Sequence, residues 1–186
     1  MADLTRELRR VLESTIKAAR EAAEIGAADA LRRLGVFESR RPERLDDASN
    51  ETRKRLRAHA KSLGDLLNAP DGEPLRRLVE AAAYVQWHRL LFSRFLLERR
   101  LLRDETGIAV SLSDCREEAA MEVSGDEWSV AASYTARMLP GVFPVEDPVE
   151  ALALAPEHAR LQTQSAHQIM TATKATEEAK LRASLS

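Results

Sequence analysis

Hydrophobic positions recur every three or four residues over most of this chain, which is the spacing of one face of an α-helix. The first periodic stretch predicts a helix from about Leu4 to Leu34, and Gly35 is a suitable residue to end it. The second half of this helix is rich in alanine, whose small side chain lets another helix approach closely. The next stretch predicts a helix from about Asp46 to Leu67, with Asp46 or Asp47 as its N-cap.

A third helix is predicted from Pro74 to about Leu102, and it holds the densest run of large apolar and aromatic residues in the chain. Arginines interrupt this run, and an unpaired buried guanidinium costs much free energy. We therefore expect Arg89 and Arg94 to bridge to neighbouring helices through carboxylates. The residues predicted to form the apolar stripe of this helix are Tyr84, Trp87, Leu91, Phe95 and Leu102.

The remainder of the chain predicts shorter elements. Residues 107–112 are suited to an extended piece or a small strand, and Ser113 resembles the capped start of a helix. A further helix is expected from Gly125 to Leu139, with Trp128 on its inner face. The pattern thus predicts an all-α bundle of five to six helices over residues 1–162, followed by a weakly packed or frayed tail over 163–186.

Composition agrees with this prediction. Of the 186 residues, 44% are hydrophobic and 31% are charged, which is typical of a soluble globular protein. Aromatic residues make up only 4%, which argues against an all-β sandwich. The chain has no apolar run of the roughly 20 residues that a bilayer requires and no apolar signal core, so we expect a cytoplasmic protein without a membrane partner.

Charge is distributed unevenly. Residues 1–103 contain 22 Lys and Arg against 16 Asp and Glu, whereas residues 104–186 contain 6 against 14. The basic half permits contact with DNA phosphates, but it equally permits attraction between the two halves, or a solvated helix face paired with nearby acids. Trp87 and Tyr84 can also stack on bases, although their place on an apolar stripe favours a core position. The candidate phosphate-contacting residues are Arg53, Lys54, Arg55, Arg57 and Lys61.

The sequence lacks the common catalytic motifs. The seven glycines are too scattered for a phosphate-binding loop, and the four histidines lie far apart. No serine occupies a nucleophile elbow, and the single cysteine, Cys115, is interpreted as a small buried side chain. We therefore assign no catalytic, cofactor-binding or metal-ligating residue, and we expect neither a cofactor nor an enzymatic activity from this chain.

Several segments together resemble the leading helical region of large adenine-specific DNA methyltransferases of restriction-modification and phage-defence systems, of the BREX and DISARM kind. The resemblance covers about residues 8–162, and it depends on the order and spacing of segments that are individually degenerate. These segments are Arg20–Val36, Arg55–Gly64, Trp87–Glu98, Met138–Phe143 with Glu146–Pro148, and Leu154–His158.

The resemblance implies only the N-terminal helical module of such an enzyme. Family members continue into a domain with a Gly-rich loop for S-adenosylmethionine and an Asn-Pro-Pro-Tyr motif for the flipped adenine. This chain has no adjacent prolines and no Gly-x-Gly, so no catalytic or cofactor residue is carried over. The leading hypothesis is a non-catalytic module that docks on the DNA backbone, on a separate catalytic subunit, or on both. The alternatives are a protein-interaction or oligomerisation module without a nucleic-acid role, and a truncated gene remnant.

Overall fold

The computed structural model describes residues 6–67, 75–121, 126–144, 147–152, 154, 158, 163–164, 166–172, 174–175 and 178. These ranges contain no β-strand; their only β-type pairing is an isolated antiparallel bridge between Arg103 and Ala109. The all-α prediction is therefore confirmed. In the same ranges, no helix combines the length and apolar character that crossing a bilayer requires. The helices are α1 (Arg6–Arg33), α2 (Asp47–Ser62), α3 (Arg76–Glu98), α4 (Leu112–Met121) and α5 (Glu127–Met138).

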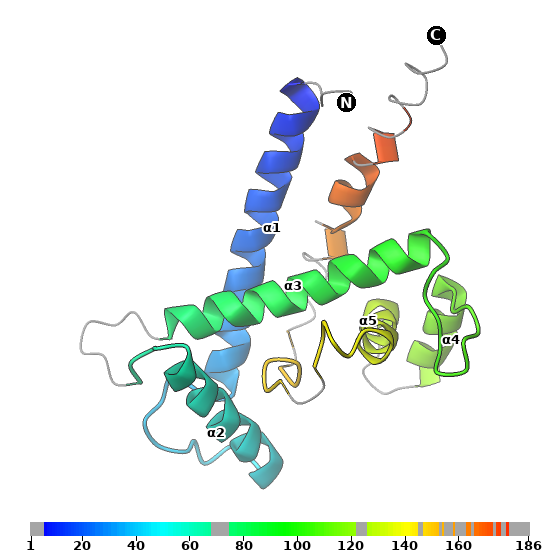
Figure 1. Cartoon of the computed structure of the whole chain (residues 1–186). Helices are drawn as coiled ribbons and strands as arrows, with labels where there is room; N and C mark the ends of the chain where they lie inside the picture. The colour runs from blue at the N-terminus through cyan, green and yellow to red at the C-terminus, as the bar shows by residue number, and fades with distance from the viewer. Residues whose placement is uncertain are drawn as a thin grey trace.

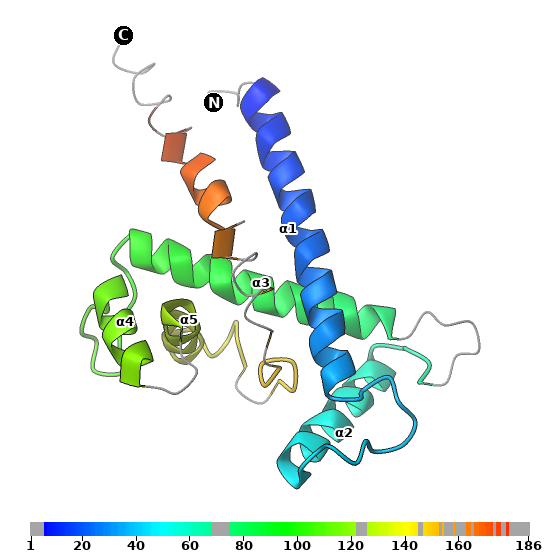
Figure 2. The ribbon, with the colours of Figure 1, turned by 180° about the vertical axis from the view of Figure 1, so that it is seen from behind.

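The long helix α3 organises the molecule. It contacts α1 and α2 near its beginning and α5 near its end, and α4 packs against α5 (Figures 1 and 2). The first half of α1 projects away from α3 on the side where the C-terminal segment also extends (Figures 1 and 2). The buried side chains accordingly form two clusters, one around α1, α2 and the first half of α3, and one around α4, α5 and the end of α3.

Helix α1 packs on α3 through its alanines. Ala19, Ala23, Ala27 and Ala30 are at most 1% exposed, so the prediction of a small-residue packing face is confirmed for the second half of the helix. Ile16, which the same stripe included, is 46% exposed. The stripe residues Leu4, Leu8 and Leu12 lie outside the residues whose side chains are described.

The helix ends follow recognisable stop signals. Gly35 has a positive φ of 62°, and the Val36 amide donates back to the Leu31 carbonyl, as the predicted glycine stop requires. A Cβ on Gly35 would also meet the ring of Pro42 at 2.4 Å. Asp46 caps α2 by accepting a hydrogen bond from the Ser49 amide at 2.7 Å, which confirms one of the two predicted caps.

The beginning of α3 is capped from a distance. Leu75 adopts a left-handed conformation with φ 58°, and its side chain makes no cap. Instead, the Asp65 carboxylate accepts hydrogen bonds from the amides of Arg77 and Leu78, at 3.1 and 2.8 Å. Two of the free amides at the helix start are thus satisfied by the loop that follows α2. The predicted first residue, Pro74, lies outside the described residues.

The face of α3 that packs into the protein is rotated from the predicted stripe. Tyr84 is 60% exposed and Phe95 is 38% exposed, so their assignment to the core is wrong. Trp87 and Leu91 are half-buried, and Leu102, beyond the helix, is fully buried. The residues that α3 buries are Leu78, Ala82, Ala83, Gln86, Leu90, Ser93 and Leu96.

The second half of the chain matches its predicted elements with small shifts. The cap of α4 is Ser111 rather than Ser113: its amide donates to the Asp114 carboxylate at 2.7 Å, and its hydroxyl accepts from the Asp114 amide. Trp128 of α5 is half-buried. In the tail, Ala166 and Ile169 are buried.

Candidate functional site

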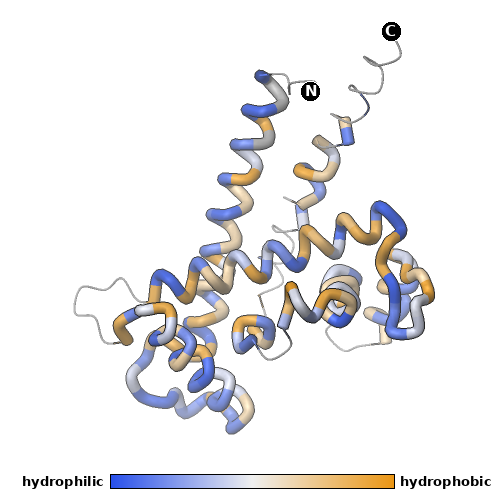
Figure 3. Tube along the Cα trace, in the orientation of Figure 1, coloured by the Kyte–Doolittle hydropathy of each residue, from blue (hydrophilic) through white to orange (hydrophobic). Residues whose placement is uncertain are grey.

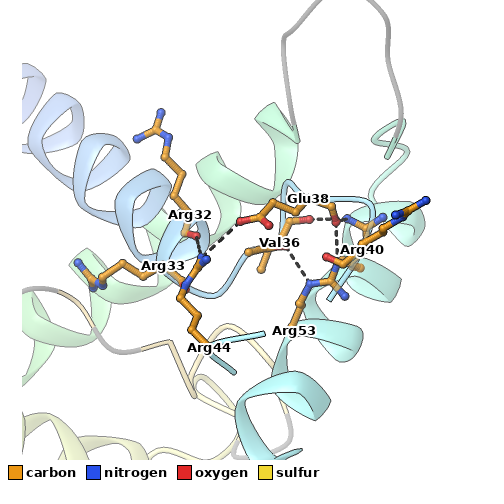
Figure 4. Close-up of polar contacts among 9 residues, drawn as sticks. Arg32, Arg33, Val36, Glu38, Arg40, Arg44 and Arg53 are labelled. Carbon is orange, nitrogen blue, oxygen red and sulfur yellow. Dashed lines mark hydrogen bonds and ion pairs between the residues drawn. The ribbon is translucent and has the colours of Figure 1, made fainter. Parts of the chain in front are cut away.

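Arg53 belongs to α2, and its side chain lies among the backbone carbonyls of the loop that connects α1 to α2 (Figure 4). It is only 5% exposed. Its Nε donates to the Gly35 carbonyl at 2.8 Å. Its Nη2 donates to the carbonyls of Glu38 and Arg40, at 2.5 and 3.0 Å. The planar fork of a guanidinium suits several carbonyl acceptors at once, so Arg53 holds the loop in place.

Arg57, one turn further along α2, extends the same arrangement. Its Nη1 donates to the carbonyls of Val36 and Glu38, at 2.5 and 2.8 Å. Burial, together with the nearby Arg53 charge, lowers the pKa of Arg57 from its ordinary value. The prediction that Arg53 contacts phosphate is therefore wrong, because its guanidinium is enclosed. Arg57 is half-buried, and its Nη1 already serves the loop.

Arg44 has a role that the sequence did not reveal. Its Nη2 donates to the carbonyls of Arg32 and Arg33, the last residues of α1, at 3.3 and 3.2 Å, and to the Glu38 carboxylate at 3.3 Å (Figure 4). The last carbonyls of a helix lack partners within the helix and carry partial negative charge, which a cation complements. The loop between α1 and α2 folds back so that Arg44 reaches the C-terminal end of α1. No local sequence signal indicates that the loop folds in this way.

The remaining candidate phosphate contacts are exposed. Lys54, Arg55 and Lys61 all have exposed side chains on α2. Lys54 lies 3.2 Å from the Glu51 carboxylate, one turn away on the same helix. An exposed pair of this kind contributes less than about 1 kcal/mol and does not prevent contact with another anion.

The two aromatic residues considered for base stacking differ in position. Tyr84 is exposed, and its ring packs edge-on against His88 with 4.5 Å between centroids. Trp87 is half-buried, and its Nε1 is buried without a hydrogen-bond partner among the described residues. Tyr84 is therefore the aromatic residue of this pair that offers a surface to a ligand.

Arg89 joins α3 to the segment after α5. It forms an ion pair with Glu150, as the sequence predicted for a bridging arginine, although the partner lies in a turn rather than a helix. Gln86 donates from the same helix to the carbonyls of Val149 and Leu152, at 3.0 and 3.1 Å. Burial raises the pKa of Glu150, and it outweighs the opposing attraction of Arg89.

Arg94 bridges α3 to other elements differently from the prediction. Its carboxylate partner, Glu98 at 2.9 Å, belongs to the same helix. The contact with α5 is instead a cation–π interaction, with the guanidinium carbon 4.9 Å from the centre of the Trp128 ring. Arg94 also lies 2.5 Å from His167 Nδ1 in the tail. An open hollow of about 430 Å³ is lined by Arg94, Trp128, Thr163, Gln164, His167 and Gln168.

No catalytic constellation is found in the described part of the chain. There, His, Cys, Asp and Glu form no group of three that could hold a metal ion. Cys115 is fully buried, and burial raises the pKa of its thiol to about 11, which disfavours the nucleophilic thiolate. The described surface offers exposed cationic and aromatic side chains, among them Lys54, Lys61 and Tyr84.

Comparison with known proteins adds no relative: no family model, curated protein or solved structure matches the chain.

Proposed function

We propose that this chain is a non-catalytic helical module of an adenine-specific DNA methyltransferase system, of the restriction or phage-defence kind, and that it docks on the DNA backbone. The observation that carries the proposal is that the segments with the resemblance meet in space around α3. Phe92 packs edge-on against Phe143, with 6.0 Å between ring centroids. The His158 ring lies 3.0 Å from the Asp29 carboxylate of α1, and Arg89 pairs with Glu150, just after the Glu146–Pro148 segment.

These contacts support reading the resemblance as one folded unit. Gly26 contributes to the same packing, because a Cβ there would lie 2.9 Å from the His158 Cβ. Glycine at this position therefore lets the His158 side chain approach α1 closely, which compensates for the weak helix propensity of glycine.

Phosphate contact is proposed for Lys54, Arg55 and Lys61. Arg53 and Arg57 fix α2 to the loop that precedes it through hydrogen bonds. The side chains of Lys54, Arg55 and Lys61 therefore extend from a helix that is held in place. Contacts of this kind bind DNA without reading its sequence, and they release counterions, which makes the affinity dependent on salt. Three phosphate contacts should weaken binding about 40-fold between roughly 50 and 200 mM salt.

Fluorescence polarisation with a labelled DNA duplex at these two salt concentrations tests the proposal. The triple variant Lys54→Glu, Arg55→Glu and Lys61→Glu should lose binding while keeping its helical circular dichroism. A matched triple reversal at the other end of the molecule, at Arg103, Arg116 and Arg137, should bind as the parent protein does. Absence of binding by the parent protein at the lower salt, or full binding by the α2 variant, would contradict the proposal.

A second function, a protein-association module, is favoured by a specific observation on α1. Val11 and Ile25 are 48% and 56% exposed. Large apolar side chains exposed on a helix suit packing against another polypeptide. Concentration-dependent association in sedimentation velocity, together with no DNA binding at low salt, would favour this function over the first.

A further inference from the structure

The loop between α1 and α2 covers two positive charges that are not neutralised within the described part of the chain. Arg53 and Arg57 donate their hydrogen bonds to carbonyl oxygens of this loop (Figure 4). Among the described residues, neither guanidinium forms an ion pair with a carboxylate. A carbonyl dipole has no net charge, so both positive charges contribute to the potential at the nearby surface.

The surface around these two arginines is basic and hydrophilic. Residues 32–61 contain ten Lys and Arg against five Asp and Glu, a net charge of +5. Hydrophilic residues dominate α2 and the second part of the loop before it (Figure 3). A surface of this kind attracts a polyanion rather than an apolar partner.

Two exposed lysines of α2 border the same place. Lys54 lies three residues before Arg57 and Lys61 lies four residues after it, so both are neighbours of Arg57 on the helix surface. Arg57 in turn contacts the loop through the carbonyls of Val36 and Glu38. Lys54 and Lys61 therefore lie along the side of α2 next to the loop.

Arg40 adds an exposed positive charge from the loop. Its carbonyl accepts a hydrogen bond from Arg53 at 3.0 Å, which fixes its backbone, while its side chain is exposed. The neighbouring Arg41 and Arg44 are both bonded to carbonyl oxygens and paired with carboxylates. Within the described ranges, the Arg40 side chain has no hydrogen bond or ion pair. It therefore gives up no contact when it meets an anion, and its backbone needs no further ordering.

We infer that Arg40 contacts a phosphate of duplex DNA beside Lys54 and Lys61, so that the interface includes the α1–α2 loop as well as α2. The inference rests on the DNA docking proposed above and adds a fourth phosphate contact to the three of α2. A phosphate at this place balances positive charge that the loop carbonyls leave uncompensated. Arginine suits the contact because its planar fork can donate two parallel hydrogen bonds to a phosphate.

The salt dependence of duplex binding counts the phosphate contacts. Each contact contributes about 0.9 to the slope of log affinity against log salt, so four contacts should weaken binding about 150-fold between roughly 50 and 200 mM salt. Arg40→Ala should bring this loss back to about 40-fold and should lower the affinity at roughly 50 mM salt by about tenfold. Fluorescence polarisation with a labelled duplex over a salt series measures both quantities.

Two further variants make the result specific. Arg40→Lys keeps the charge and should keep the slope of the parent protein. Arg10→Ala removes another exposed arginine, about 35 Å along α1 from Arg33 at its C-terminal end, and should bind DNA as the parent protein does. Arg40→Ala should also keep the melting temperature of the parent protein in circular dichroism, because the fold uses only the Arg40 carbonyl.

The outcomes separate this inference from the function on which it rests. A parent protein that does not bind DNA at the lower salt removes both. If Arg40→Ala keeps the affinity and slope of the parent protein while the triple α2 variant loses binding, the inference is overturned and docking through α2 stands. Equal losses for Arg40→Ala and Arg10→Ala also overturn it, because they show a response to net charge rather than to a local contact.

Discussion

Arg53 and Lys54 are adjacent in the sequence and about 100° apart around α2, yet the Arg53 side chain is buried and the Lys54 side chain is exposed. Arg53 is enclosed and donates hydrogen bonds to the carbonyls of three loop residues. Lys54 is exposed and pairs with a carboxylate one turn away. The same cluster of positive charge therefore contains residues that build the fold and residues that are available to a partner. A basic run in a sequence cannot be assigned to one purpose until the surrounding backbone is known.

The largest effect is expected for another interior arginine, Arg89. Arg89→Met removes the partner of the buried Glu150 carboxylate, and losing one member of a buried pair typically costs about 3–5 kcal/mol. The pKa of Glu150 is already above its value in the unfolded chain, so folding favours its protonated form. The destabilisation should therefore grow as pH rises through that pKa. Urea denaturation at several pH values measures it.

A control variant makes the Arg89 result specific. Adding Glu150→Gln to Arg89→Met removes the unpaired charge and should recover much of the lost free energy of unfolding and its pH dependence. Equal stability of the single and double variants would show that the ion pair is unimportant.

Arg53 compared with Lys54 gives the direct test of this difference. Arg53→Met removes three hydrogen bonds from a buried guanidinium to loop carbonyls, and we expect a loss of about 3 kcal/mol in the free energy of unfolding. Lys54→Met should change the free energy of unfolding by less than about 0.5 kcal/mol, because an exposed pair contributes little. Chemical denaturation of both variants measures the difference, and equal losses would remove the distinction between the two residues.

Gly35 should show a smaller effect on the same loop. Its φ of 62° disfavours any other residue, and a Cβ would meet Pro42, so Gly35→Ala should lower the free energy of unfolding by about 1–2 kcal/mol. Gly141→Ala is the matched control, because a Cβ at Gly141 meets nothing within 4 Å. Thermal unfolding of the two variants tests this, and a melting temperature unchanged by Gly35→Ala would contradict the role of the turn.

The smallest effect concerns the cap of α2. Hydrogen bonds from Ser49 hold the pKa of Asp46 below its usual range, so its contribution is present above the unfolded-state pKa of about 3.9. That contribution is lost as pH falls through the lower folded-state pKa. Asp46→Asn keeps an oxygen acceptor at the cap but does not titrate, and it should flatten this part of the acid unfolding curve. Acid titration followed by circular dichroism compares the two proteins, and superimposable curves would contradict the prediction.

Much of the helical framework was predictable because its signals are local. The stop at Gly35 and the cap at Asp46 each depend on a few consecutive residues, and both were confirmed. The α4 cap was misplaced by two residues because Ser111 and Ser113 both resemble caps, and the backbone decides between them. The buried face of α3 was predicted wrongly at Tyr84 and Phe95, since spacing alone locates an apolar stripe but not the neighbours that cover it.

By itself, the sequence determined the helical class, the approximate helix ends and the alanine face of α1, because side-chain spacing, propensity and capping act over a few residues. Only the tertiary structure decided that Arg53 is enclosed while Lys54 faces outward, that Asp65 caps α3 from a preceding loop, and that Arg44 reaches the end of α1. Those outcomes depend on which segments the chain brings together after each turn. These tertiary contacts are set by packing between residues far apart in the sequence, and no local pattern predicts them.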